Sequence, residues 1–376
     1  MAGIYIHIPF CKQACSYCNF HFSTRLTQKT ILLDALKKEI ILTNQSNHSL
    51  EIIETIYFGG GTPSLLTPEE IEDLLKTVKQ HFLIDPDAEI SLEANPDDVE
   101  PSIAEKWLQM GINRLSLGVQ SFNESELKWM NRAHNANQSL KSIDDILSAG
   151  FSNFSVDLIY GSPLLSNEDF IKNVETVLDK NIPHVSAYAL TVEPKTALYK
   201  MISQKNSAPV DENKQAEQFH LLPSLMEHGG YEQYEISSFA KPGFRSRHNS
   251  SYWQGKPYYG FGPAAHSYNG KNIRRWNIEN NALYIKSLEK NNIPYEEETL
   301  TTIQRLNETI MIALRTMEGI DVEKIKNDFG EKYSETLLNN AVKYINDKKL
   351  ITLNAKLLLT KEGKFFADGI AAGLFF

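Results

Sequence analysis

Hydrophobic residues follow two different spacings along the first half of the chain. Short apolar and β-branched runs predict six strands, at residues 4–8, 55–58, 88–94, 114–119, 154–159 and 184–190. Between these runs, apolar residues recur at helical spacing and predict helices at residues 28–42, 102–110, 124–130, 138–149 and 167–180. A further helix should begin at Thr67, a typical N-cap residue that is followed by a proline and two acids.

This alternation of strands and helices has a direct consequence for the fold. Parallel strands need crossover connections, so repeated strand–helix units predict a parallel sheet that is covered by helices. Six units within about 190 residues fit a partial (β/α)6, TIM-like barrel of the α/β class. Chemistry should then lie at the C-terminal ends of the strands, where the loops after neighbouring strands meet.

The pattern changes after the sixth predicted strand. Residues 195–210 are polar and irregular, which predicts a lid or a connection, and residues 213–228 predict a helix. Residues 237–277 are rich in aromatic side chains, glycine and arginine, and they predict a layer of loops and short strands.

The last part of the chain has a helical rhythm again. From Thr301 the pattern predicts three helices and then two short strands, at residues 350–352 and 356–359, an order that resembles a small winged-helix module. We therefore expect three regions: the barrel, an aromatic-rich connecting region, and a C-terminal winged-helix-like domain, at residues 1–235, 236–298 and 299–376.

Composition narrows the functional classes. The chain has 376 residues, 41% of them hydrophobic and 23% charged, as in globular proteins, and no run of about 18 apolar residues that would predict a membrane span. The N-terminal residues carry neither a basic leader nor a small-residue cleavage site, so we expect a cytoplasmic protein. The net charge of −9 disfavours a phosphate-binding surface, and we expect no nucleic-acid partner.

The cysteines indicate a metal site. The chain has three, Cys11, Cys15 and Cys18, all within eight residues directly after the first predicted strand. An odd number at this spacing is a poor disulfide framework and is typical of a reducing compartment. Three thiolates can hold an iron–sulfur cluster. A zinc ion with His21 as the fourth ligand, or three small buried side chains, are the alternatives that spacing leaves open.

Two motifs together carry a family resemblance. The segment from Cys11 to Cys18 resembles the CxxxCxxC signature of the radical S-adenosylmethionine (SAM) superfamily, including the aromatic Tyr17 before the last cysteine. Gly59-Gly60-Gly61-Thr62-Pro63 is similar to the glycine-rich element that approaches SAM in that family, and the Gly-Lys-Ser/Thr of a phosphate loop does not follow it. The resemblance implies a [4Fe–4S] cluster with one open iron, to which SAM binds.

Polar residues in or just after predicted strands extend the expected SAM site. Glu93, Gln120 and Asp157 stand at such positions, and buried groups of this kind need a partner, either a ligand or another protein group. Arg132 follows a helix closely and could pair with a carboxylate in the same pocket. The full set of expected SAM-binding residues is Tyr5, Tyr17, Gly60, Gly61, Thr62, Glu93, Gln120, Arg132, Asp157 and Thr191.

Nearly the whole chain resembles the oxygen-independent coproporphyrinogen III oxidase branch (HemN) of this superfamily, with two departures. Phe20 stands where the oxidase pattern has a further cysteine, and the first strand begins almost at the first residue, without the extension of the oxidase. Both features, and the motif His248-Asn249-x-x-Tyr252-Trp253, are similar to the HemW family of heme chaperones.

The HemW resemblance implies a heme site and a function. His248, Asn249, Tyr252 and Trp253 are the expected heme residues, because imidazole ligates heme iron and aromatic rings offer flat apolar surface. The nearby arginines 245, 247, 274 and 275 could pair with heme propionates. The resemblance implies delivery of heme to membrane hemoproteins of respiration, which a cytoplasmic protein would meet peripherally at the membrane. The resemblance does not decide whether the protein forms a homodimer or whether it cleaves SAM.

Three other functions remain at this stage. The first is oxidative decarboxylation of coproporphyrinogen III, so whether the chain is an enzyme is left open. A radical SAM methylase commonly uses additional cysteines, which this chain lacks, and a DNA-binding regulator is disfavoured by the acidic charge. His266 is expected either to face the SAM pocket or to be structural, and His7, His21 and His134 are expected to be structural.

Overall fold

The computed structural model describes residues 1–46 and 51–376. Within these ranges a twelve-stranded sheet has the order β12-β11-β10-β9-β1-β2-β3-β4-β5-β6-β8-β7. Its centre consists of parallel strands β1 (Ala2–Ile8), β2 (Ile52–Gly60), β3 (Leu83–Ala94), β4 (Arg114–Gln120), β5 (Phe154–Tyr160) and β6 (His184–Ala189). The six predicted strands are all present, and the partial TIM-like barrel is confirmed.

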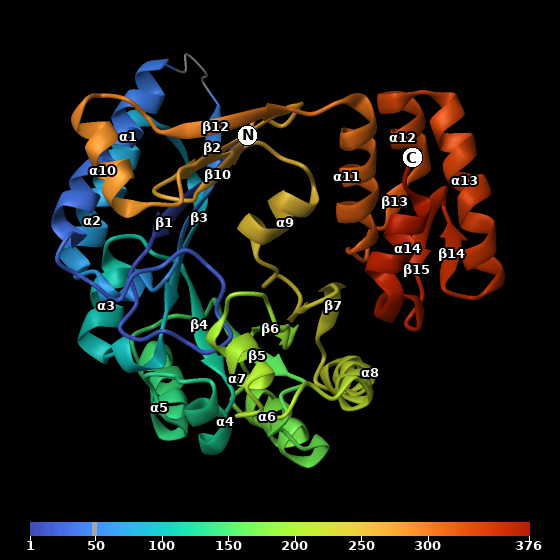
Figure 1. Cartoon of the computed structure of the whole chain (residues 1–376), viewed down its shortest axis with the longest axis horizontal. Helices are drawn as coiled ribbons and strands as arrows, with labels where there is room; N and C mark the ends of the chain where they lie inside the picture. The colour runs from blue at the N-terminus through green and yellow to red at the C-terminus, as the bar shows by residue number, and fades with distance from the viewer. Residues whose placement is uncertain (47–50) are drawn as a thin grey trace.

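The crossover helices cover the outside of this sheet (Figure 1). They are α1 (Lys29–Ser46), α2 (Pro68–His81), α3 (Pro101–Gln109), α4 (Glu124–Trp129), α5 (Ala136–Ser148) and α6 (Asn167–Asp179), with the short 3-10 turns η1 (Pro63–Leu65) and η2 (Pro96–Asp98) after β2 and β3. The predicted start of α2 is confirmed, since the Thr67 side chain accepts from the Glu70 amide while the Glu70 side chain accepts from the Thr67 amide.

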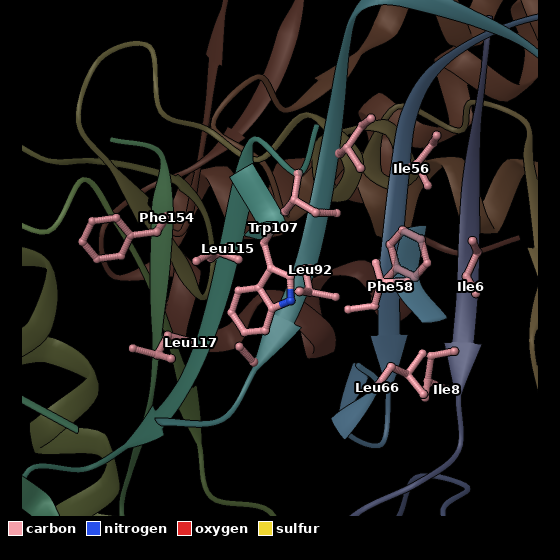
Figure 2. Packing of buried hydrophobic residues seen from close by; sticks show 14 of the residues in the cluster. Ile6, Ile8, Ile56, Phe58, Leu66, Leu92, Trp107, Leu115, Leu117 and Phe154 are labelled. Carbon is pink, nitrogen blue, oxygen red and sulfur yellow. The ribbon is translucent and has the colours of Figure 1, made fainter. Parts of the chain in front are cut away.

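The outward face of the parallel strands is apolar. Ile6 and Ile8 on β1, Phe58 on β2 and Leu92 on β3 are fully buried against the helices, together with Trp107 of α3 (Figure 2). Alternate residues of a strand point to opposite faces, so this outward apolar set leaves the other set facing the interior of the barrel.

The inward face is largely polar. It carries Tyr5 and His7 on β1, Thr55 and Tyr57 on β2, Glu89, Ser91 and Glu93 on β3, Ser116 and Gln120 on β4, and Ser155 and Asp157 on β5. The parallel register places these residues beside one another, because Tyr5 is paired with Tyr57, Tyr57 with Ser91, and Glu93 with Ser116. A barrel with a hydrogen-bonding interior is suited to a polar ligand rather than to a close-packed core.

Further strands extend the sheet on both sides of these six. At one edge β6 pairs with β8 (Ser238–Ala240), which pairs with β7 (Glu232–Glu235). At the other edge β9 (Tyr258–Phe261) pairs with β1 in parallel, and β10 (His266–Tyr268), β11 (Ile273–Asn277) and β12 (Tyr295–Thr299) follow in antiparallel pairing. The aromatic region after residue 236 thus contributes strands to the sheet of the barrel.

Two expectations for the middle of the chain are wrong. Residues 195–210 are not wholly irregular, because Thr196 caps the short helix α7 (Ala197–Ser203), whose Leu198 is buried. The layer at 237–277 contains the helix α9 (Arg247–Trp253) besides its strands. The predicted helix at 213–228 is confirmed as α8 (Glu212–His228). The helix α10 (Asn281–Glu289), which packs on α1, was not predicted.

The C-terminal residues form a module beside the barrel, to which β12 leads (Figure 1). Its elements are α11 (Thr302–Leu314), β13 (Ile320–Asp321), α12 (Val322–Phe329), α13 (Glu331–Asn346), β14 (Leu350–Leu353), β15 (Lys356–Leu359), η3 (Gly363–Phe366) and α14 (Ala367–Leu374). The predicted order of helices and strands is confirmed, with β13 and α14 in addition. The module has a hydrophobic core of its own, around Leu306, Ile310 and Leu337. In the ranges that the structure covers, no helix is both long and apolar enough to span a bilayer.

Candidate functional site

The cysteine loop begins directly after β1, at the C-terminal end of the barrel. Cys11, Cys15 and Cys18 are unpaired and half-buried. The Thr62 hydroxyl donates to Cys11 Sγ at 3.5 Å, and Arg132 Nη1 lies 3.3 Å from Cys15 Sγ. The loop is tied to the barrel through its backbone as well, since the Cys11 amide donates to the Ser23 carbonyl.

One hydrogen-bond network joins the residues around the thiols. Asn95, just after β3, donates through Nδ2 to Thr62 Oγ1 at 3.2 Å and accepts through Oδ1 from Arg132 Nη2 at 2.6 Å. Arg132 Nη2 also donates to the Gly118 carbonyl at 2.7 Å, at the end of β4. The pairing of this arginine with a carboxylate stays a prediction; its partners within the protein are the Asn95 amide, the Gly118 carbonyl, the Cys15 thiol and the Tyr17 hydroxyl.

The donor set fits an iron–sulfur cluster better than a single ion. Among the residues that the structure describes, no three or more His, Cys, Asp and Glu side chains converge closely enough to hold one metal ion. The His21 ring is directed elsewhere, because its Nε2 lies 2.7 Å from Asn281 Oδ1. Without His21 the loop offers three thiolates, which fit three corners of a cubane rather than a closed four-ligand zinc site.

The glycine-rich strand end lies against this loop. A Cβ on Gly61 would come within 2.6 Å of the Phe10 carbonyl oxygen, so only glycine lets the two backbones approach here. Gly60 has φ of 114° and donates through its amide to Glu93 Oε2 at 3.2 Å. Gly60, Gly61 and Thr62, three of the expected SAM residues, therefore lie between Cys11 and Glu93.

Two carboxyl groups of the barrel interior have shifted pKa values. Burial raises the pKa of Glu93 to about 7, although Tyr57 OH donates to its Oε1 at 2.8 Å. Burial raises the pKa of Asp157 to about 6, and the Ser116 hydroxyl donates to its Oδ2 at 3.3 Å. Perturbed carboxyl groups in a polar lumen are typical of a ligand site.

The remaining expected SAM residues lie around the same end of the barrel. Gln120 ends β4 with a strained φ of 68°, and its Nε2 lies close to Gly118. Tyr17 packs against the cluster of Met130 and Leu198, and its hydroxyl lies 3.5 Å from Arg132 Nη1. Thr191, after β6, is exposed and donates to the Ala189 carbonyl at 3.4 Å.

Tyr5 connects the barrel interior with the cysteine loop by a different route. Its hydroxyl lies 3.1 Å from His7 Nδ1, and His7 Nε2 lies 3.0 Å from the His21 carbonyl oxygen. Burial lowers the pKa of His7 to about 4, so its ring is neutral at physiological pH. Both His7 and His21 have protein partners, as expected of structural histidines.

The His-Asn-x-x-Tyr-Trp motif forms the helix α9, which closes the opposite end of the barrel. Buried Glu89 of β3 accepts from the Arg247 amide through Oε2 and from the His248 amide through Oε1, both at 2.9 Å. Ser246 accepts from the Asn249 amide as the N-cap. Two side chains therefore satisfy the first amides of this short helix and fix its position.

His248 points into the barrel and is fully buried. Its Nδ1 lies 2.8 Å from Thr55 Oγ1 and its Nε2 lies 2.8 Å from the Tyr252 hydroxyl, while its ring stacks on Tyr57 at 4.9 Å. Burial lowers its pKa to about 3. Since both ring nitrogens have protein partners, His248 could ligate an iron only after its hydrogen bond to Thr55 or to Tyr252 had been broken.

A large cavity lies between the barrel and the C-terminal module. Its volume is about 1010 Å³. Tyr5 and His7 of β1 lie on its wall. The rest of the wall comes from the segment Asn19, Phe20 and His21 after the cysteines, from the aromatic layer with Tyr252, Trp253, Tyr258, His266 and Tyr268, and from the module with Arg305, Met311 and Lys324. Of the four expected heme residues, Tyr252 and Trp253 lie on the cavity wall, whereas His248 and Asn249 are not among the residues that form it.

The arginines that were expected to bind propionates have internal partners. Arg245 pairs with Glu318 at 2.9 Å, Arg274 pairs with Glu308 at 2.9 Å, Arg275 pairs with Glu297 at 2.5 Å, and Arg247 donates to the Asp87 carbonyl at 2.5 Å. The first two pairs join the aromatic layer to the C-terminal module. A propionate that binds these arginines would have to compete with the carboxylates.

Two residues of this architecture, Asn95 and Glu89, were not identified as functional from the sequence, and the place of a third, His266, was left open between the SAM pocket and a structural role. Asn95 links the thiol loop to Arg132, and the Asn-Pro turn after a strand was the available signal. Glu89 caps α9 from a residue about 160 positions away, for which the sequence gives no signal. His266 lies exposed on the cavity wall, a position that depends on how β10 joins the sheet.

The comparisons with known proteins agree with the fold and the motifs. Residues 5–177 match the Radical SAM superfamily, and residues 300–366 match the HemN C-terminal domain. The solved structure of coproporphyrinogen III oxidase (HemN) from Escherichia coli, a radical SAM enzyme, superposes with a TM-score of 0.86 over 100% of this chain and 90% of that chain. With 21% identity, this likeness establishes the fold alone.

Sequence relatives define the family more narrowly. The protein named heme chaperone HemW from Mycobacterium tuberculosis is 32% identical over 99% of this chain and 94% of its own length. The protein of the same name from Bacillus subtilis is 33% identical over 98% of both chains. These matches span the barrel, the aromatic layer and the C-terminal module together. The chain belongs to the HemW family of radical SAM proteins.

Proposed function

We propose that this protein is a heme chaperone that binds heme in the cavity beside its barrel. The single observation that carries the proposal is the cavity itself. Its volume of about 1010 Å³ lies at the upper end of the range of about 300–1,000 Å³ for small-molecule sites. Aromatic rings of α9, β9 and β10 line one side, as a flat macrocycle requires.

The second part of the proposal is a SAM-ligated [4Fe–4S] cluster on Cys11, Cys15 and Cys18. The three cysteines would hold the cluster, and the cluster would supply one-electron chemistry to bound SAM. Glu93, Gln120 and Asp157 offer polar contacts to SAM from the barrel interior, with Tyr5, Tyr17, Gly60, Gly61, Thr62 and Thr191 around them. Arg132 and Asn95 hold the thiol loop against the strand ends.

We propose that the heme is passed to membrane hemoproteins of respiration. The relatives at 32 and 33% identity are named heme chaperones, and a chaperone has to release its cargo. The cavity supports this role because its walls belong to parts of the chain with separate hydrophobic cores, around Ile6 and around Leu306. Parts with separate cores can move relative to one another and open the site between them.

Anaerobic reconstitution tests the proposal. The purified chain is incubated with iron and sulfide and then titrated with hemin, and iron, sulfide and heme are quantified together with the oligomeric state. We expect a cluster that is lost on substitution of Cys11, Cys15 or Cys18 by alanine, retained in the exposed control Thr24→Ala, and heme bound in a stoichiometric amount. A colourless or zinc-loaded protein would contradict the proposed cluster. Turnover of coproporphyrinogen III would show that the protein is an oxidase and would contradict the chaperone function.

A further inference from the structure

The three histidines on the wall of the large cavity differ in the hydrogen bonds that their ring nitrogens make. His7 has partners on both ring nitrogens, and the His21 ring is held by Asn281 and lies 4.0 Å from Glu279. The third, His266, is exposed, and within residues 1–46 and 51–376 neither of its ring nitrogens makes a hydrogen bond or an ion pair. Heme iron binds an imidazole through a ring nitrogen that is accessible and that no protein group occupies, and His266 meets both conditions.

The position of His266 is well defined by its strand. It pairs with Trp276 of β11 in the antiparallel register, and the two rings stack with their centroids 6.1 Å apart. Tyr268, two residues along β10, therefore lies on the same face and also lines the cavity. Stacking on Trp276 restricts the imidazole ring without using its nitrogens, which leaves them available for a ligand.

A cationic side chain lies on the part of the cavity wall that the C-terminal module forms. Arg305 of α11 lines the same cavity as Tyr268, and its guanidinium lies over the Phe329 ring at 5.6 Å. In the part of the chain that the structure describes, Arg305 has no ion pair with a carboxylate, unlike Arg245 and Arg274. A guanidinium without a carboxylate partner at the edge of an aromatic cavity can bind a propionate.

We propose that His266, rather than the motif residue His248, is the iron ligand of bound heme, and that Arg305 binds a propionate of the same heme. This inference rests on the proposed heme-binding function and specifies its site. His266 belongs to the barrel sheet and Arg305 to the C-terminal module, so a heme on both residues bridges the two parts of the chain.

Hemin titration of the full-length protein tests the assignment. We compare the wild type with His266→Ala, His248→Ala, Arg305→Gln and the control His228→Ala, an exposed histidine on α8 away from the cavity. The His266→Ala variant is expected to bind hemin at least about tenfold more weakly and to show a shifted Soret band. Loss of a group that only orients a metal ligand lowers affinity about 10–100-fold, and loss of the ligand itself should cost at least as much. Arg305→Gln is expected to weaken binding without a change in the Soret band, and His228→Ala should match the wild type.

Chemical rescue separates a ligand from a structural residue. Added imidazole should restore the wild-type spectrum of the His266→Ala variant and leave the His248→Ala spectrum unchanged. If the wild type binds heme and His266→Ala binds it with the same affinity and spectrum, the assignment of His266 is overturned while the proposed function stands. If the wild type binds no heme, the proposed function fails and the assignment fails with it.

Discussion

His248 provides the sharpest test of how the motif acts, because the structure assigns it to the architecture of the barrel. Replacement by alanine removes a fully buried ring that is hydrogen-bonded to Thr55 Oγ1 and to the Tyr252 hydroxyl. Each buried partner left without a hydrogen bond costs about 1–3 kcal/mol. Loss of a buried aromatic ring costs about 3–5 kcal/mol through the cavity that it leaves. These terms overlap, and we expect His248→Ala to lower the free energy of unfolding by about 3–5 kcal/mol.

The assay is urea denaturation of the heme-free protein, followed by tryptophan fluorescence. The four tryptophans of the chain, Trp107, Trp129, Trp253 and Trp276, all precede the C-terminal module, so their fluorescence reports on the barrel and its aromatic layer. The matched control is His266→Ala, in which the same truncation removes an exposed ring and should change stability by less than about 0.5 kcal/mol. Equal unfolding midpoints for the two variants and the wild type would refute the structural role of His248.

The pH dependence of unfolding tests the same residue in another way. Burial lowers the pKa of His248 to about 3, whereas an unfolded histidine titrates near about 6.5. The stability contributed by the neutral ring is therefore complete above about pH 6.5 and is lost as the pH falls towards 3. At pH 5 the loss is about 2 kcal/mol, from about 1.5 pH units at about 1.4 kcal/mol per unit. The His248→Ala variant should lack this part of the acid destabilisation.

Three further predictions concern the rest of the site. Cys15→Ala should abolish the [4Fe–4S] absorption after anaerobic reconstitution, and iron retained at the wild-type amount would contradict the ligand assignment. Arg132→Gln removes the donor to Cys15 Sγ and to the Gly118 carbonyl, and the reconstituted cluster should lose iron at least about tenfold faster in a chelator assay. Burial raises the pKa of Glu39, the partner of Tyr284 and Asn277, to about 7. Its stabilising contribution is complete below about pH 4.5 and is lost as the pH rises through 7, so Glu39→Gln should lose less stability than the wild type between pH 5 and 8.

The strand and helix positions of the barrel were predictable because they depend on local signals. The apolar face of each parallel strand must be buried against helices, and this requirement produced runs such as Ile4, Ile6 and Ile8. The Thr67 cap acts within four residues, so its helix start could also be read from the sequence. Polar residues such as Glu89, Ser91 and Glu93 alternate with apolar ones along β3, which indicates a polar face. This alternation does not tell whether the polar face lines the interior of a barrel or faces solvent.

The positions that the sequence did not predict depend on contacts between distant segments. Residues 247–253 are helical because Glu89, about 160 residues earlier, accepts from their first amides. The resemblance associated His248 with heme, yet its environment is set by Thr55 and Tyr57 on another strand. The accessibility of His266 follows from the pairing of β10 with β11 and from the adjacent C-terminal module.

The proposed cluster and heme sites share a segment of chain, and this has a thermodynamic consequence. Cys18 is followed directly by Asn19, Phe20 and His21, which form part of the cavity wall. A cluster on the cysteines restricts the start of this segment, and heme in the cavity restricts its end. Because linkage is reciprocal, any factor by which the cluster changes heme affinity must equal the factor by which heme changes cluster affinity. Asn19, Phe20 and His21 are therefore the residues through which such coupling would act.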